Sequence, residues 1–219
     1  GANIWLAVPI IVISAAMIVG VVLVDLAERR IPVQYAKRMV GRKMYGGQGT
    51  HIPLKVNATG VLPLIFASAI MQFPATIFSF MSEDIGIARF WNTYMSYTSP
   101  WYIVIFAVLV FAFTFFYSSI SFNPIEISKN IQQNGGMVPG IRQGKPTSDF
   151  IARISRRVTL FGALFLMVLA SVPTIIYNLI GFSLPFVASS LLIAVSVAIE
   201  TTRQLEAQMT MRHYKGFLK

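Results

Sequence analysis

The chain has 219 residues, of which 55% are hydrophobic and only 12% are charged. An average soluble domain is about one-quarter charged, so this composition argues against a soluble globular enzyme, a disordered tail and a fibrous protein. The 18 Lys and Arg residues outnumber the 8 Asp and Glu residues, and the absence of cysteine excludes disulfides, thiolate nucleophiles and cysteine-based metal sites.

Long segments without charge predict membrane-spanning helices. A spanning helix needs about 20 apolar residues, and charged residues are absent over residues 1–24, 56–82, 90–125 and 158–199. The third segment opens with a polar and aromatic stretch, typical of a membrane interface, so its span starts near Trp101.

The fourth segment is too long for one helix, and Gly181 and Pro185 indicate a tight turn within it. We therefore expect an all-α, multi-span transmembrane bundle with five spans. The expected spans cover about residues 4–24, 59–80, 101–122, 158–179 and 185–199.

The basic residues predict the orientation of this bundle. The connections at about 27–56 and 123–157 and the tail at 200–219 alternate with the other connections, so they lie on one side. Together they carry every Lys and Arg except Arg89. The positive-inside rule then places both long loops and the tail in the cytoplasm and Gly1 outside it.

Chemistry that depends on ionisable groups is not expected inside the membrane. Asp25 and Glu200 lie at the ends of spans, and no other ionisable side chain falls within one. Ion-coupled transporters and intramembrane proteases rely on such groups. His51 and His213 are isolated loop histidines that we expect at the surface. We therefore expect no enzymatic activity, no metal and no cofactor.

The two long loops are more than minimal connectors. Residues 31–55 contain several glycines and prolines and predict a structured basic hairpin. In the second loop we expect a helix over residues 124–133, capped at residues 134–136. A further helix is expected to start with Thr147 or Ser148 as N-cap.

Some basic residues in these loops suggest a large anionic partner, either nucleic acid or an acidic protein surface. Arg42, Lys43 and Arg142 fall at loop tips, where a role in fixing topology explains them poorly. The alternative is that the charges only set the topology and contact lipid phosphates. That alternative accounts well for arginines next to the membrane, such as Arg156 and Arg157.

Specific strings in both loops resemble the SecY family of protein-conducting channel subunits. The first loop carries Glu28–Arg38 (ERRIPVQYAKR) and Thr50–Asn57 (THIPLKVN), and the second carries Asn134–Arg142 (NGGMVPGIR). The resemblance runs from about residue 20 to 219 and covers helices six to ten, the C-terminal half of the bacterial fold. The chain departs from the family at residues 187–189, where Val-Ala-Ser replaces a usual Gly-Gly-Thr run.

The resemblance implies a channel with an apolar pore ring and a lateral gate for signal sequences. Ile65 and Ile193 match pore-ring positions, and Leu62 is a weaker candidate. Asn57 and Thr59 match the start of the lateral-gate helix.

The basic loops match those that dock the SecA motor ATPase or the ribosome. The docking residues that the resemblance implies are Arg30, Arg42, Lys43 and Arg142.

The resemblance also implies partners and a location. The partners are SecE, SecG, SecA, the ribosome, signal sequences, nascent secretory chains, the N-terminal half of SecY and membrane lipids, all at the bacterial plasma membrane. From the residues alone, two other functions remain as alternatives. A secondary transporter predicts an inverted repeat and intramembrane charges, which the sequence lacks. A membrane scaffold without conduction differs from a channel only through the family resemblance.

Overall fold

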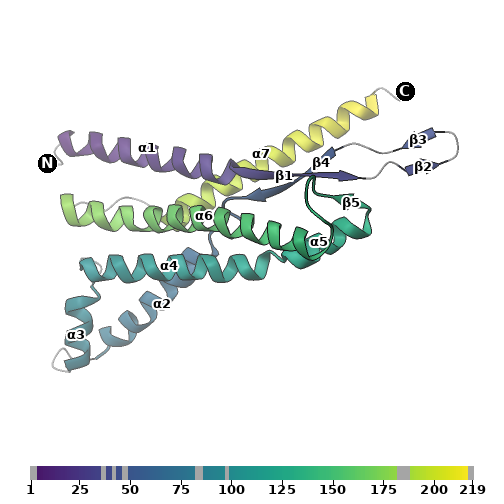
Figure 1. Cartoon of the computed structure of the whole chain (residues 1–219). Coiled ribbons are helices and arrows are strands. Elements are labelled where there is room, and N and C mark those ends of the chain that lie inside the picture. Colours follow the sequence, from purple (N-terminus) through teal and green to yellow (C-terminus); the bar gives the residue numbers. More distant parts are fainter. Residues whose placement is uncertain are drawn as a thin grey trace.

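The computed structural model describes residues 4–35, 38–40, 43–45, 49–81, 86–96, 99–181 and 188–216. Helices dominate, and strands and one short helix gather at one end of the molecule, as Figure 1 shows. The helices are α1 (Ile4–Leu26), α2 (Leu62–Ser79), α3 (Gly86–Tyr94), α4 (Pro100–Ser121), α5 (Pro124–Gln133), α6 (Lys145–Ile180) and α7 (Ala188–Gly216).

The prediction of an all-α multi-span bundle is confirmed. Four helical segments in the described part of the chain are long and apolar enough to cross a membrane. They are Val8–Leu26, Leu62–Ser79, Pro100–Gln133 and Lys145–Leu179.

The fifth expected span, at 185–199, is not among the described helices that are long and apolar enough to cross a membrane. It forms the start of α7, but the apolar part of α7 ends at Ile199 and the helix continues through polar residues. Residues 182–187, which include Pro185, lie outside the described residues. The first part of the aromatic stretch, up to Tyr94, belongs to a short helix, α3, where the sequence predicted only an interfacial segment.

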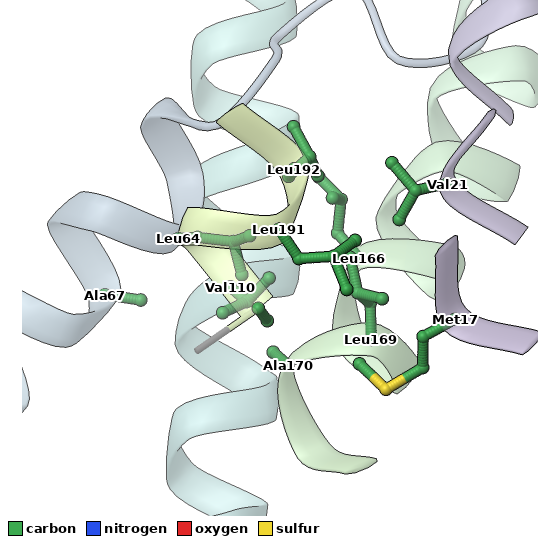
Figure 2. Close-up of a cluster of buried hydrophobic side chains, with 11 residues drawn as sticks. Met17, Val21, Leu64, Ala67, Val110, Leu166, Leu169, Ala170, Leu191 and Leu192 are labelled. Atoms are coloured by element: carbon green, nitrogen blue, oxygen red, sulfur yellow. The ribbon is translucent and has the colours of Figure 1, made fainter. Parts of the chain in front are cut away.

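The core of the bundle is one apolar cluster to which five helices contribute (Figure 2). Helices in a membrane associate through close van der Waals packing and hydrogen bonds between helices. One such bond joins α4 and α6, where the Ser118 and Thr159 hydroxyls lie 2.7 Å apart. The buried residues are Met17 and Val21 of α1, Leu64, Ala67, Val110, Leu166, Leu169, Ala170, Ala188, Leu191 and Leu192.

The first long loop is a β-hairpin. The sequence predicted a structured hairpin here without specifying its strands. Strand β1 (Glu28–Tyr35) pairs antiparallel with β4 (Gly49–Lys55), from Glu28 opposite Lys55 to Gln34 opposite Gly49. Two short strands of the same loop, β2 (Arg38–Val40) and β3 (Lys43–Tyr45), pair with each other.

The second loop adds a strand to this hairpin, so the two loops form one unit. Strand β5 (Gly136–Met137) pairs with β1 and gives the sheet order β4-β1-β5. A second apolar cluster lies behind the sheet and combines residues from both loops with α6. Its buried members are Ile31, Val33, Leu54, Ile131, Val138 and Ile151.

The close contact between the two loops requires glycine at position 136. A Cβ atom there would lie 2.9 Å from side-chain atoms of both Ile131 and Tyr35, closer than carbon atoms normally approach. Local sequence alone predicted the cap of α5 at this position, and the contact between the loops adds a second reason for glycine.

Helix α5 has the predicted bounds, whereas α6 begins earlier than predicted. The Asn123 side chain caps α5 by accepting from the backbone N–H groups of Ile125 and Glu126. Helix α6 starts at Lys145 after Gly144. The prediction of Thr147 or Ser148 as N-cap is wrong, because the Thr147 hydroxyl instead donates to the carbonyl oxygen of Arg142 at 2.8 Å.

Candidate functional site

The three pore-ring candidates have apolar side chains that are exposed on the surface of the bundle. Leu62 and Ile65 of α2 and Ile193 of α7 are 46%, 42% and 43% exposed. Their neighbours Leu64 and Leu192 are almost fully buried in the core, as the close-up in Figure 2 shows. Helices α2 and α7 therefore each present one face to the bundle and one apolar face away from it.

Aromatic rings anchor α2 to the bundle at one side. The ring of Phe66 lies 5.3 Å from that of Tyr117 and 6.2 Å from that of Phe113, both on α4. A cavity of about 600 Å³ lies along α2 from Leu64 to Ala75. Its lining includes Gln72 of α2, Trp91 of α3 and Thr174 of α6. Helix α2 thus contacts α4 through aromatic rings and also lines an unfilled space between the helices.

The gate candidates Asn57 and Thr59 lie in the connection between β4 and α2, and both are buried. The Asn57 side-chain amide donates to the Asp25 carboxylate at the end of α1, with an Nδ2–Oδ1 distance of 3.3 Å. The Val56 N–H donates to the carbonyl oxygen of Ala27 at 3.0 Å. This connection is therefore fastened to the end of α1.

Helix α6 holds the same connection from another side. A Cβ atom at Gly162 would lie 2.4 Å from the carbonyl oxygen of Val56, so the backbone of α6 can approach this closely only because Gly162 has no side chain. Sequence reasoning missed Asp25 and Gly162, because neither belongs to a motif and each meets the connection through the fold.

The docking candidates that the structure describes lie in β1, β3 and the turn before α6, at the end of the molecule that holds the sheet, where Figure 1 also shows the end of α7. Arg30 of β1 is exposed, and its Nε lies 2.8 Å from a Glu28 carboxylate oxygen. Such exposed ion pairs contribute at most about 1 kcal/mol. Arg42 lies outside the described residues, and only the backbone of Lys43, in β3, is described.

Arg142 lies in a turn whose backbone is well fixed while its side chain is exposed. The Thr147 hydroxyl holds its carbonyl oxygen, and the Gln143 amide donates to the carbonyl oxygen of Gly136 at 2.9 Å. Gly140 and Gly144 adopt φ angles of 80° and 89°, a region that favours glycine. The turn therefore presents Arg142 to solvent from a fixed position.

The described residues offer no metal site: among them, no three His, Asp or Glu side chains gather closely enough to hold an ion. Taken together, the four helices long and apolar enough to cross a membrane and the structured basic loops at one end define a polytopic membrane protein. Comparison with known proteins refines this class. The family model described as SecY matches residues 2–202, and the chain belongs to the SecY family.

Curated relatives agree with this assignment. Protein translocase subunit SecY of Streptomyces galbus is 43% identical over 219 residues, covering 96% of this chain and 49% of the relative. The same subunit of Thermus thermophilus is 47% identical over 203 residues, covering 91% and 45%. The chain thus spans about half the length of the curated relatives it matches, which fits the predicted C-terminal half.

A solved structure shows the same fold. The chain described as "The structure of a protein conducting channel" matches with a TM-score of 0.59 at 18% identity, covering 91% of this chain and 49% of that one. The family resemblance expected from the loop strings is therefore confirmed by sequence and by fold.

Proposed function

We propose that this chain forms half of the channel that moves unfolded secretory proteins across the bacterial plasma membrane and inserts membrane proteins into it. Membership of the SecY family over residues 2–202 carries this proposal. The chain contributes no catalysis, and a partner supplies the energy. Both long loops and the tail face the cytoplasm, where their basic residues are favoured.

Leu62, Ile65 and Ile193 contribute to an apolar constriction in this proposal. A hydrophobic constriction blocks ions by dewetting and can seal around a moving polypeptide. The exposure of these side chains, beside neighbours buried in the core, supports the assignment. Residues on the buried faces of α2 and α7 cannot line the constriction, because they are already packed against other helices.

Helix α2 forms one wall of the lateral gate, with Asn57 and Thr59 at its start. A signal sequence enters as an apolar helix and shifts the gate toward its open state if it binds that state better. The cavity along α2 supports this role, since a helix with an unfilled flank can move at lower cost than one packed along its whole length.

The basic end docks the SecA motor ATPase or the ribosome through Arg30, Arg42, Lys43 and Arg142. Arginine suits both partners, because its guanidinium group binds carboxylates and phosphates in a bidentate manner. Contacts with ribosomal RNA depend on phosphate charge and weaken with salt.

The remaining open surface fits the subunits and lipids that complete the channel. Apolar side chains of α1 are exposed along the helix. We assign them to contacts with membrane lipids, with SecE and SecG, or with the N-terminal half of SecY. They include Val8, Ile11, Val12, Val19 and Leu23.

Photo-crosslinking tests the pore directly. A photoreactive residue at Ile65 of the complete protein, rebuilt with a stalled secretory chain, should form adducts with that chain. The matched control is the same residue at Leu64, which faces the core and should label neighbouring helices only. Adducts from position 65 to lipid or helices alone would remove Ile65 from the pore and favour the scaffold function.

A further inference from the structure

A small hollow lies between α4 and α6, near the end of the bundle that carries the long loops. Its volume is about 220 Å³. Its lining runs along α4 from Phe115 to Phe122 and along α6 from Ala152 to Thr159, and none of the lining residues is Asp or Glu. On each helix these residues follow the spacing i, i+3, i+4 and i+7, so each helix turns one continuous face to the hollow.

The polar groups of the hollow are hydrogen-bond donors for which the described residues supply no acceptor. Arg156 is exposed, and the only ion pair among the described residues lies within β1. The Ser155 hydroxyl makes no hydrogen bond to a described residue. Ser118 and Thr159 share one hydrogen bond of 2.7 Å, which uses the hydrogen of only one of the two hydroxyls. Spare donors around one positive charge favour an anion with several acceptor oxygens.

The hollow lies at the boundary between the apolar and the basic part of α6. Arg156 stands two residues before the charge-free segment that begins at residue 158. Side chains of a helix lean toward its N-terminus, so the guanidinium group extends from this boundary toward the loops, the direction in which lipid headgroups lie. The nearest acidic residue along α6 is Asp149, about 10 Å before Arg156 along the helix axis.

An apolar track leads from Arg156 into the membrane. Leu160 and Leu164 follow Arg156 at intervals of four residues and are 42% and 41% exposed. Residues with this spacing lie one above the other on the same side of a helix. The surface therefore combines a cationic end with an apolar strip, which matches the two parts of a phospholipid.

We infer that the hollow binds the phosphate of one anionic phospholipid in the cytoplasmic leaflet, with Arg156 and Ser155 as its ligands. One acyl chain of this lipid lies over Leu160 and Leu164. The inference rests on the proposed orientation of the bundle, which places the hollow at the leaflet that carries negative surface charge. The hollow takes the headgroup alone, because it is smaller than the pockets of about 300–1,000 Å³ that enclose drug-sized ligands.

Native mass spectrometry of the complete channel, purified and stripped of lipid, measures this binding. The probes are phosphatidylglycerol, which is anionic, and phosphatidylethanolamine, which is zwitterionic. Arg156→Gln removes the charge at similar side-chain length, and Ser155→Ala removes the hydroxyl. Arg153→Gln is the matched control, because Arg153 is also an exposed arginine of α6 but does not line the hollow.

We expect Arg156→Gln to weaken phosphatidylglycerol binding by about tenfold or more and Ser155→Ala by about threefold, the ranges for charged and neutral hydrogen bonds. Arg156→Lys keeps the charge but loses bidentate geometry, so its affinity should fall between those of the wild type and Arg156→Gln. Arg153→Gln should leave the affinity nearly unchanged. Phosphatidylethanolamine should bind more weakly than phosphatidylglycerol and respond less to each variant.

Three results would overturn the inference. Unchanged phosphatidylglycerol binding by Arg156→Gln would remove Arg156 from any lipid site. Equal losses for Arg153→Gln and Arg156→Gln would mean that lipid is attracted to the basic surface in general and not to the hollow. Glycerol 3-phosphate carries the phosphate without acyl chains, and equal affinity for it would make the hollow a site for soluble phosphate compounds. None of these measurements involves translocation, so failure of the lipid site and failure of the proposed channel function are distinguishable.

Discussion

Replacing Gly162 with alanine inserts a methyl group between α6 and the connection that leads into α2. The added Cβ atom would lie 2.4 Å from the Val56 carbonyl oxygen and 3.4 Å from its carbonyl carbon. Ordinary contact begins near 3.4 Å, so helix and connection must separate by about 1 Å. Tightly packed interiors accommodate such a shift only at a cost.

The cost follows from two opposing effects. Overpacking of this kind destabilises by about 1–3 kcal/mol, and the shift also strains the Val56–Ala27 hydrogen bond on the same connection. Alanine is favoured over glycine within a helix by up to about 1 kcal/mol. We therefore expect Gly162→Ala to lower the free energy of unfolding by about 1–2 kcal/mol.

Thermal unfolding of the complete purified protein in detergent measures this difference. The melting temperature should fall by about 2–4 °C for Gly162→Ala. Gly20→Ala is the matched control: it also lies within a spanning helix, but its Cβ atom would meet only Phe165 at 3.6 Å. That variant should melt at or slightly above the wild-type temperature.

Equal melting temperatures for the two variants would contradict the close approach of α6 to Val56. A higher melting temperature for Gly162→Ala would do so more strongly, since it would mean that only helix propensity had changed. Either result would also mean that α6 does not hold the connection that leads into α2.

Three further variants test the proposed channel and the proposed docking residues. Arg142→Glu should abolish motor-driven translocation without lowering the melting temperature, because the side chain is exposed; normal export would refute its function. Ile65→Asn combined with Ile193→Asn should raise ion conductance across planar bilayers, and unchanged conductance would remove both from the pore ring. Thr147→Val deletes the donor to the Arg142 carbonyl and should weaken motor binding severalfold, about 1 kcal/mol; full affinity would show that the turn needs no such support. Ribosome binding should fall steeply between about 50 and 500 mM salt, and a flat response would exclude phosphate contacts as its basis.

Local signals in the sequence were sufficient to locate the four helices that are long and apolar enough to span a membrane, and the bounds of α5, but not to establish the fifth expected span. Charge-free runs locate helices because charge is costly in lipid, and the bounds of α5 follow from Asn123, Pro124 and Gly135 at its ends. The start of α6 was misplaced because Thr147 makes a bond across the turn, which competes with capping.

Contacts between distant residues were beyond the reach of the sequence. Nothing local distinguishes the exposed Ile65 from the buried Leu64, since both are aliphatic residues of one helix. The pairing of Asp25 with Asn57 joins residues 32 positions apart, and the union of the two loops depends on strand β5 meeting β1. Only the fold brings these groups together.

The union of the loops has a mechanical consequence. Ile151 of α6 is fully buried in the cluster that joins them, and α6 runs for 36 residues with Pro173 inside it, a length of about 54 Å. A displacement of either loop is therefore coupled directly to the start of α6, and Pro173, which lacks one helical hydrogen bond, is where the helix can bend. Between the loops and Pro173, Gly162 of the same helix lies against Val56 in the connection to α2, and Leu166 lies in the core, so one helix joins the basic end, this connection and the bundle core.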